Sequence, residues 1–228
     1  MKSRYFPAIA LVLLTLASCT PGDADVRVRR IPRGLAPEEC WSSAEEVIFS
    51  DTNISDNTVR VRSLWNRDSL YFLFDVADRN LWATQTEHDD KLLYLDDMCE
   101  VLLDPRMDRG ELWLEDDIIY HVNLLGTVKD DRGEPGGGKD VGWNGKAATS
   151  VTLAGVLNAD SLAIGYSVRF AIPWSEIGRR PRKGLRLGIN LGCGDRDSLQ
   201  TSKRLFFYRY YYPTRTPSSF ACLALEGE

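Results

Sequence analysis

The fold is decided first at residues 70–77, which read LYFLFDVA. Alternate positions of this stretch carry large apolar side chains, namely Leu70, Phe72, Phe74 and Val76. A side-chain period of two is typical of a β-strand with one face in a core. Residues 59–65 alternate in the same way, and the polar triplet 66–68 between the two runs is a turn signal. The sequence therefore predicts a strand pair over residues 59–77.

Short runs with the same period follow at 98–104, 117–124, 147–157, 162–172, 185–193, 205–212 and 219–225. Turn signals such as residues 158–160 and 181–184 separate them. No stretch of the sequence keeps apolar residues at helical spacing over three turns, and residues 173–177 allow one helical turn at most. Strands in this number without intervening helices predict an all-β fold, a single antiparallel β-sandwich of two packed sheets with short helical turns only.

The N-terminal residues indicate export. Lys2 and Arg4 precede an apolar run at residues 8–14, which is about half the ~20 residues that a membrane-spanning helix needs. The run leads into residues 16–19, LASC, which resemble the lipobox of bacterial lipoproteins and imply cleavage before Cys19 and lipidation of its thiol. Ordinary secretion, with Cys19 incidental, is the alternative.

We therefore expect a signal peptide over residues 1–18, a lipid-anchored tether over 19–37 and a folded domain over 38–228. The tether is assigned because residues 20–36 mix Pro, Gly, Asp and Arg. Thr20, rather than the aspartate linked to inner-membrane retention, follows Cys19. The predicted location is the cell envelope, at the outer membrane.

Charge and histidine content exclude two kinds of site. Lys and Arg number 28 against 33 Asp and Glu, a net charge of −5, which repels a nucleic-acid backbone. The chain has only two histidines, His88 and His121, too few for a multi-histidine metal centre. The 43% hydrophobic content is that of a globular protein.

The chain has five cysteines, so lipidation of Cys19 leaves four: Cys40, Cys99, Cys193 and Cys222. An exported protein meets an oxidising compartment, where an even set can pair, and four cysteines allow three pairings. Buried thiols are the alternative for Cys99 and Cys193, which fall on apolar strand faces. The sequence does not choose between these outcomes.

Polar residues interrupt two of the expected strands. Glu100 lies on the run 98–104, and His121 and Asn123 share one face of 117–124. Such groups are costly inside a fold unless they are hydrogen-bonded or solvated. They indicate either a concave sheet face that meets a polar ligand or an ordinary solvent-exposed outer face.

Residues 126–146 form the longest interruption between strands, and loops of this length are typically functional or disordered. Trp143, near its end, presents a flat apolar ring that suits sugar stacking. It fits equally well as a plug that fixes the loop to the core.

Catalytic motifs are weak, with no GxSxG and no histidine in a nucleophile arrangement, so we predict no enzymatic activity. Oxygen ligands at residues 87–90 and 116–117 suit calcium, although neither segment has EF-hand spacing. Simple solvation of these acidic residues is the alternative.

Three segments carry a family resemblance. Residues 63–72 (SLWNRDSLYF), 97–105 (DMCEVLLDP) and 165–174 (GYSVRFAIPW) resemble, in this order, the "WD...LY", "D..EV..DP" and "GY.vE.aIPW" motifs of carbohydrate-binding module family 9. Shorter matches at 40–44, 75–78, 81–90, 120–130, 155–158 and 188–195 extend the resemblance over about residues 40–226. The chain is most similar to the family-9-like subgroup found in exported bacterial proteins.

The resemblance implies a β-sandwich that binds sugars without cleaving them, often with structural calcium. By position, Tyr94 would be an aromatic platform, Glu100 a hydrogen-bonding carboxylate and His121 the basic residue of the next strand. The expected carbohydrate site comprises Tyr94, Asp97, Glu100, His121, Asn123 and Trp143. Its ligand would be a mono- or oligosaccharide, and glycan-degrading enzymes are the expected partners.

Three departures from the family pattern predict weakened or altered binding. Thr214 stands where a second aromatic platform is expected, Gly192 where some members carry a polar contact, and Arg169 where a glutamate is usual. Residues 210–212, all tyrosine, are candidate substitutes for the second ring.

Two other functions fit the same sequence. A degenerate module would serve as an envelope protein-interaction or assembly subunit. A haem-binding redox sandwich would use Met98 and His121 on neighbouring strands.

Overall fold

The computed structural model describes residues 24–159, 163–198, 201–207 and 216–227. Among these residues, no helix combines the length and apolar character needed to cross a membrane. The one α-helix is a single turn, α1 (Trp174–Ile177), as the sequence predicts, and four 3₁₀ turns accompany it. They are η1 (Pro37–Glu39), η2 (Trp41–Ser43), η3 (Leu93–Leu95) and η4 (Pro217–Ser219).

The rest of the regular structure is β. The strands are β1 (Val26–Arg30), β2 (Glu46–Phe49), β3 (Thr58–Trp65), β4 (Ser69–Ala77), β5 (Met98–Asp104), β6 (Ile118–Asn123), β7 (Val128–Gly133), β8 (Lys139–Asp140), β9 (Ala148–Ala154), β10 (Gly165–Pro173), β11 (Arg186–Ser198), β12 (Thr201–Phe206) and β13 (Ala221–Leu225). The predicted all-β class is confirmed.

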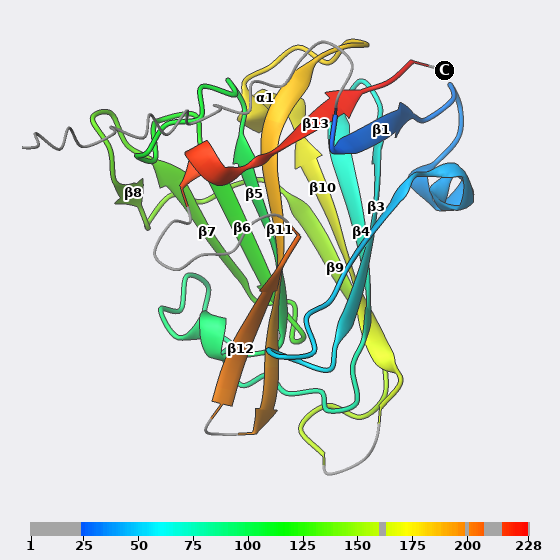
Figure 1. Cartoon of the computed structure of the whole chain (residues 1–228), viewed down its shortest axis with the longest axis vertical. Coiled ribbons are helices and arrows are strands. Elements are labelled where there is room, and N and C mark those ends of the chain that lie inside the picture. Colours follow the sequence, from blue (N-terminus) through cyan, green and yellow to red (C-terminus); the bar gives the residue numbers. More distant parts are fainter. Residues whose placement is uncertain (1–23, 160–162, 199–200, 208–215, 228) are drawn as a thin grey trace, which may run out of the picture.

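The strands form one curled mixed sheet (Figure 1). One half runs β8-β7-β6-β5-β11-β13 and the other runs β3-β4-β10-β9, with β12 beside β11 and β2 beside β3. Strand β1 joins the halves, because it pairs in parallel with β13 on one side and with β3 on the other. The expectation of a purely antiparallel arrangement is therefore wrong at β1.

A single main core lies between the two halves. Phe72 and Phe74 of β4 belong to the same buried cluster as Val101 of β5 and Ile189 of β11. Within it the Phe74 ring meets the Phe170 ring edge-on, 5.6 Å between centroids. The alternation that predicted β4 is confirmed, since all four of its core-facing side chains are at most 4% exposed.

Strand β1 corrects the expected boundary between tether and domain. Residues 26–30 read VRVRR, and Val26 and Val28 are buried while Arg27 and Arg29 point outward. This is strand alternation, which the Pro, Gly and Asp residues around it obscured. The described fold thus extends to residue 24, well inside the predicted tether.

The long interruption at residues 126–146 is also partly strand. Strands β7 and β8 form a hairpin that continues the sheet beyond β6. The polar sequence VKDDRG hid β7, although Asp130 is buried there and accepts a hydrogen bond from the Gly145 N–H at 3.0 Å. A single unstructured loop is therefore not what these residues form.

All four remaining cysteines are buried thiols in this structure. Cys99 and Cys193 face each other across β5 and β11, and burial raises the pKa of the Cys99 thiol. Cys40 packs in a small cluster with Trp41, and Cys222 lies on β13. The thiol alternative, rather than a disulfide, describes this structure.

Candidate functional site

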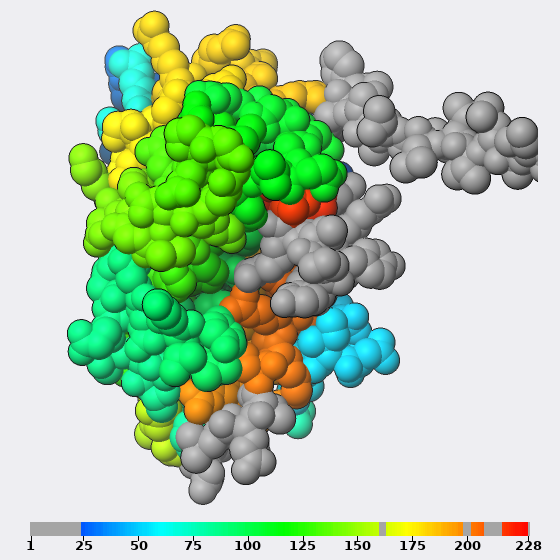
Figure 2. All heavy atoms as spheres, turned by 90° about the vertical axis from the view of Figure 1, so that its left-hand side faces the viewer, coloured from blue at the N-terminus to red at the C-terminus, as the bar shows by residue number. Residues whose placement is uncertain are grey.

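A cavity of about 810 Å³ opens on the face shown in Figure 2. It is bordered by the β2–β3 loop, η3, β6, β7, β8 and β12, through Asn53, Ile54, Tyr94, Leu95, His121, Lys129, Asp131, Lys139, Ser202, Lys203 and Arg204. In Figure 2 the β12 region, in orange, lies between the segment around residue 94, in teal, and the segment around residue 53, in light blue. A volume of this size suits a sugar of one to a few rings.

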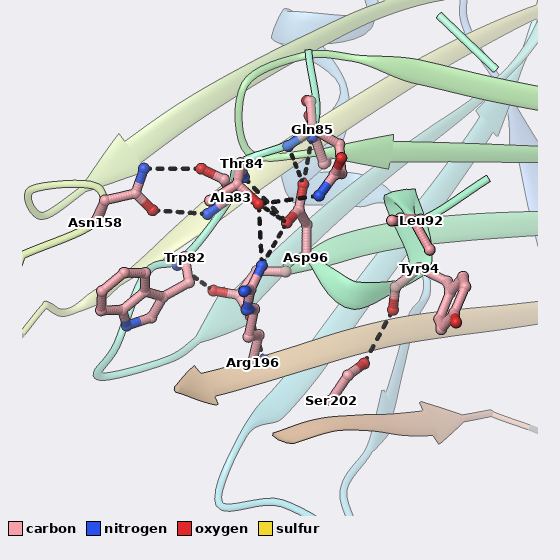
Figure 3. Close-up of polar contacts among 12 residues, drawn as sticks. Trp82, Ala83, Thr84, Gln85, Leu92, Tyr94, Asp96, Asn158, Arg196 and Ser202 are labelled. Atoms are coloured by element: carbon pink, nitrogen blue, oxygen red, sulfur yellow. Dashed lines mark hydrogen bonds and ion pairs between the residues drawn. The ribbon is translucent and has the colours of Figure 1, made fainter. Parts of the chain in front are cut away.

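Tyr94 is the aromatic group at this cavity. It sits in the 3₁₀ turn η3, and 45% of the residue is exposed. The Ser202 hydroxyl of β12 donates to the Tyr94 carbonyl at 3.0 Å, as Figure 3 shows, so the turn is tied to the neighbouring strand. The Arg204 guanidinium carbon lies 5.6 Å from the ring centroid. Tyr94 is therefore a held but accessible ring.

Below this ring lies an ion-paired group. His121 Nε2 is 3.0 Å from Glu100 Oε2, because the two residues are directly opposite on β6 and β5. Arg204 Nη1 is 3.4 Å from Glu100 Oε1. Glu100 is fully buried and lies under the cavity, whereas His121 and Arg204 reach its wall. Glu100 does not border the cavity but contacts two residues that do, and its contact with ligand stays a prediction.

Gly192 explains why one family position has lost its side chain. A Cβ at Gly192 would lie 2.4 Å from Glu100 Cγ and 2.6 Å from Glu100 Oε1. The Glu100 side chain crosses this part of β11, so any larger residue would displace it.

Strand β7 supplies a second polar wall. Lys129 Nζ and Asp131 Oδ1 are 2.6 Å apart, and the His121 Nδ1 lies 3.2 Å from the Lys129 carbonyl. Both side chains border the cavity. Lys139 of β8 also borders it, with its ammonium 4.2 Å from the Trp113 ring centroid. Sequence reasoning missed these residues and Arg204, because it assigned no strand to β7 and placed the β12 strand at 205–212.

Asp97 and Asn123 do not line the cavity. Asp97 is buried and accepts hydrogen bonds from the Trp82 and Arg196 N–H groups. Asn123 is buried too, and its amide donates to the Gln85 carbonyl at 2.8 Å. Asn123 was predicted as a ligand contact from its place on a strand face, and Asp97 from its place in the family motif. In the structure neighbouring backbone groups hydrogen-bond to both.

Trp143 is also away from the cavity. It packs against the core with its ring 5.8 Å from that of Tyr120, and the Arg132 guanidinium carbon is 5.6 Å from its centroid. Of the two interpretations of this residue, the plug onto the core fits the structure.

The segment that leads to Tyr94 is held by buried hydrogen bonds (Figure 3). Asp96 accepts from the Thr84 N–H at 3.0 Å and the Gln85 N–H at 2.9 Å, and it pairs with Arg196 at 3.0 Å. The Asn158 side-chain amide accepts a hydrogen bond from the Ala83 N–H and donates one to the Ala83 carbonyl. The base of the Tyr94 turn is consequently fixed to β11.

Among the described residues, four groups of side chains could hold a cation, and they include both segments singled out in the sequence. They are His88–Asp89–Asp130, Asp104–Asp116–Asp117, Asp56–Asp195–Asp197 and Asp78–Asp97–Asp195, each with ligand atoms within 4.8 Å of one another. In the last group all three carboxylates are buried, and the Lys203 ammonium lies 3.9 Å from Asp195 Oδ2. Burial, followed by the other carboxylates, raises the pKa of Asp97 to about 9, and burial raises that of Asp78 to about 7. Closely packed oxygen donors of this kind fit a hard cation such as calcium.

The remaining positions where the sequence departs from the family pattern lie away from this cavity or outside the described residues. Arg169 is an exposed residue of β10 on the opposite half of the sheet, with Glu38 at 3.9 Å. Thr214 and residues 210–212 lie outside the described residues.

Residues 34–209 match the model of the carbohydrate family 9 binding domain-like family. The chain belongs to this family. It is a family of non-catalytic binding modules, as the sequence resemblance implies.

Solved structures of similar fold agree with this assignment. A family 9 module from Caldicellulosiruptor kristjanssonii in complex with cellotriose has a TM-score of 0.69 and 21% identity, covering 89% of this chain and 94% of its own. A putative carbohydrate-binding protein from Bacteroides uniformis has a TM-score of 0.66 and 16% identity, covering 88% and 98%. The fold of the family 9 module is thus the fold of this chain.

Among curated proteins, the chain is similar to parts of large enzymes. It is 27% identical over 197 residues to endo-1,4-beta-xylanase A of Thermoanaerobacterium saccharolyticum, which is 84% of this chain and 15% of the enzyme. It is 26% identical to exoglucanase XynX of Acetivibrio thermocellus, again over 84% of this chain and 16% of the enzyme. The chain therefore spans about a sixth of these relatives, as an accessory domain would.

The haem interpretation gains no support from the geometry. Met98 is fully buried, and both ring nitrogens of His121 lie within hydrogen-bond reach of Glu100 or the Lys129 carbonyl.

Proposed function

We propose that this module binds a mono- or oligosaccharide, without cleaving it, in the cavity beside Tyr94. The observation that carries the proposal is the half-exposed Tyr94 ring in an 810 Å³ cavity, with charged side chains around it and a buried carboxylate below. The relatives support the class of ligand, since solved family 9 modules of this fold hold cellotriose and glucose.

The two kinds of contact have separate roles. A pyranose ring presents C–H groups to an aromatic face, and burial of that face supplies apolar binding energy. Lys129, Asp131, His121 and Arg204 supply donors and acceptors for hydroxyl groups. Because ion pairs already position these side chains, little conformational entropy is lost when a sugar replaces water.

The test is calorimetric titration of glucose and cellotriose into wild type, Tyr94→Ala and Leu92→Ala. Loss of stacking at Tyr94 is expected to weaken binding about tenfold or more. Leu92 is the matched control, since it is 48% exposed in the adjacent turn but does not border the cavity. Equal affinity of the two variants, or no heat with any glycan, would contradict the proposal.

We further propose that the module is lipid-anchored at the cell envelope and acts with glycan-degrading enzymes. The lipobox-like residues 16–19 support the anchor, and the xylanase and exoglucanase relatives support the association with glycan breakdown. Detergent-phase partitioning of wild-type and Cys19→Ser chains tests the anchor.

Calcium is proposed as a structural ion at Asp78, Asp97 and Asp195. These carboxylates would bind it. Burial, and after it the neighbouring carboxylates, raises the pKa of Asp97 and Asp78, and a bound cation would favour their charged forms. Since Asp97 also holds the Trp82 and Arg196 backbone, the ion would stiffen the base of the Tyr94 segment.

A further inference from the structure

A second concave site lies away from the sugar cavity and is unusually basic. It has a volume of about 580 Å³, and its lining includes Trp65 with Arg30, Arg67, Arg180, Arg182 and Lys183. We call this site the basic groove. None of its described lining residues is acidic, although the chain as a whole carries a net charge of −5.

The groove is built on fixed elements. Trp65 is 4% exposed, its indole N–H donates to the Glu226 carbonyl at 2.9 Å, and the Arg30 guanidinium carbon lies 5.4 Å from its ring centroid. The Trp174 N–H donates to the Asp68 carbonyl at 3.0 Å, which ties the β3–β4 turn bearing Arg67 to α1. The Gly184 N–H donates to the Leu225 carbonyl at 2.8 Å, which ties the 180–183 segment to β13.

The charges at the mouth of the groove are available. Arg67, Arg180, Arg182 and Lys183 are exposed, and among the described residues none of these four forms an ion pair. Glu226, which precedes the lining residue Gly227, pairs instead with Arg27 at 3.2 Å. Four like charges in one depression repel one another, so an anion there would be stabilised.

The position of the groove points to its ligand. Arg30 ends β1, and Val26, which begins it, is seven residues from Cys19 in the sequence. Seven residues span at most about 25 Å, and the strand itself adds roughly 13 Å. In Figure 1, β1 and β13 lie side by side at the upper end of the view, whereas β12, which borders the sugar cavity, is toward the lower end. An acyl chain on Cys19 would therefore hold the basic end near the lipid surface.

We propose that the basic groove docks the module onto an anionic membrane by binding headgroup phosphates. The inference rests on the proposed anchor for its choice of ligand. Arginine and lysine both bind phosphate well, and basic residues near an anionic leaflet each contribute a measurable attraction that salt screens. Docking at this end would leave the sugar cavity open to water.

Vesicle co-sedimentation tests the proposal with the chain that begins at Thr20 and so lacks any acyl group. This chain retains every described residue of the fold. Binding is expected to vesicles containing phosphatidylglycerol but not to pure phosphatidylcholine, and to fall as salt rises. Arg180→Gln with Arg182→Gln should lower the partition coefficient roughly 10- to 25-fold, about fivefold for each charge removed.

The matched control is Arg79→Gln with Lys91→Gln, which removes two exposed charges elsewhere and should leave partitioning within about twofold. Equal loss in both double variants, or no preference for anionic vesicles, would overturn the proposal. Separate arms use inorganic phosphate and polygalacturonate. Groove-dependent binding of either without vesicle binding would reassign the site to a soluble phosphate or an acidic glycan and reject membrane docking. Sugar affinity of the groove variant should match wild type, so failure here is distinct from failure of the Tyr94 site.

Discussion

At the scale of single residues, the chemistry of the sugar cavity depends on groups that do not touch its space. Glu100 does not border the cavity, yet it contacts and orients both His121 and Arg204. Gly192 has no side chain, and this leaves room for the Glu100 side chain. A residue can thus govern a binding surface by what it leaves room for.

Gly192→Ala should lower the free energy of unfolding by about 1–3 kcal/mol, because a methyl group would overlap the Glu100 side chain. Sugar affinity should fall with it, since Glu100 orients His121 and Arg204. Denaturant unfolding and calorimetry measure the two effects. Gly142→Ala is the control, as its nearest atom, Asp140 Oδ1, would be 3.6 Å away.

The free energy of unfolding should depend on pH through Asp117. Burial, followed by Asp104 and Asp116, raises its pKa to about 7, against roughly 3.9 in an unfolded chain. The folded state therefore keeps a proton that the unfolded state releases. This contribution is complete below pH ~4 and is lost as the pH rises through about 7.

Asp117→Asn should flatten this decline by an amount on the order of 2 kcal/mol between pH 4 and 7, measured by unfolding in EDTA. The amide oxygen can still accept the Leu114 N–H, which Asp117 now accepts at 2.7 Å. The exposed Asp68→Asn variant is the control. Parallel pH profiles for wild type and Asp117→Asn would show that Asp117 is not responsible.

At the scale of elements, alternation predicted the strands with long apolar faces, but it missed the short strand β1, whose buried face is only Val26 and Val28, and the polar strand β7. Strands β3, β4, β5, β6 and β10 were predicted to within a few residues because their core-facing positions are large and apolar. Strand β7 was not predicted because its buried positions include Asp130 and Asp131. The cost of burying them is offset by the Gly145 N–H, which lies 15 residues from Asp130, and by Lys129, which pairs with Asp131.

The candidate site shows the same division. Tyr94 and His121 were predicted and do border the cavity, while Lys129, Lys139 and Arg204 were not. The former lie in segments with a family pattern, and the latter depend on strand register, which a single sequence does not reveal. Asp97 and Asn123 were predicted as ligand contacts, and the structure places them in hydrogen bonds with backbone groups, a difference that a single sequence does not reveal.

The Asp78–Asp97–Asp195 group joins the segment after β4 to β5 and β11, so calcium there should act on the connection between elements. At a calcium concentration about 100 times its Kd, binding should raise the free energy of unfolding by about 2.7 kcal/mol, which corresponds to a rise in Tm of roughly 5–10 °C. Thermal unfolding in calcium and in EDTA measures this.

Asp195→Asn should abolish the calcium-dependent rise in Tm, whereas Asp68→Asn should retain it. An unchanged calcium-dependent rise in Asp195→Asn would assign the ion to another acidic group, and no rise in wild type would mean that the fold binds no calcium.

At the scale of the whole molecule, β1 is the strand that connects the two halves of the sheet among the residues that the structure describes. Removing β1 would leave the backbone edges of β13 and β3 without this partner strand. It would also expose the core side chains that pack against Val26 and Val28. Unpaired edges of this kind promote aggregation.

A chain that begins at Pro32 should therefore be mostly insoluble or lose several kcal/mol of unfolding free energy, whereas a chain that begins at Thr20 should match the longer protein. Size-exclusion chromatography and denaturant unfolding compare the two. Similar stability of both chains would mean that the halves hold together without β1.

The pairing of β1 with β13 also orders events in time. Residues 26–28 find their partners at residues 223–225, far along the sequence. Because synthesis proceeds from the amino end, strand β1 stays unpaired on this side, with its valines uncovered, until residues 223–225 have been made. An interruption before that point would leave the two halves of the sheet apart, with the exposed apolar surface that makes partly folded chains prone to aggregate.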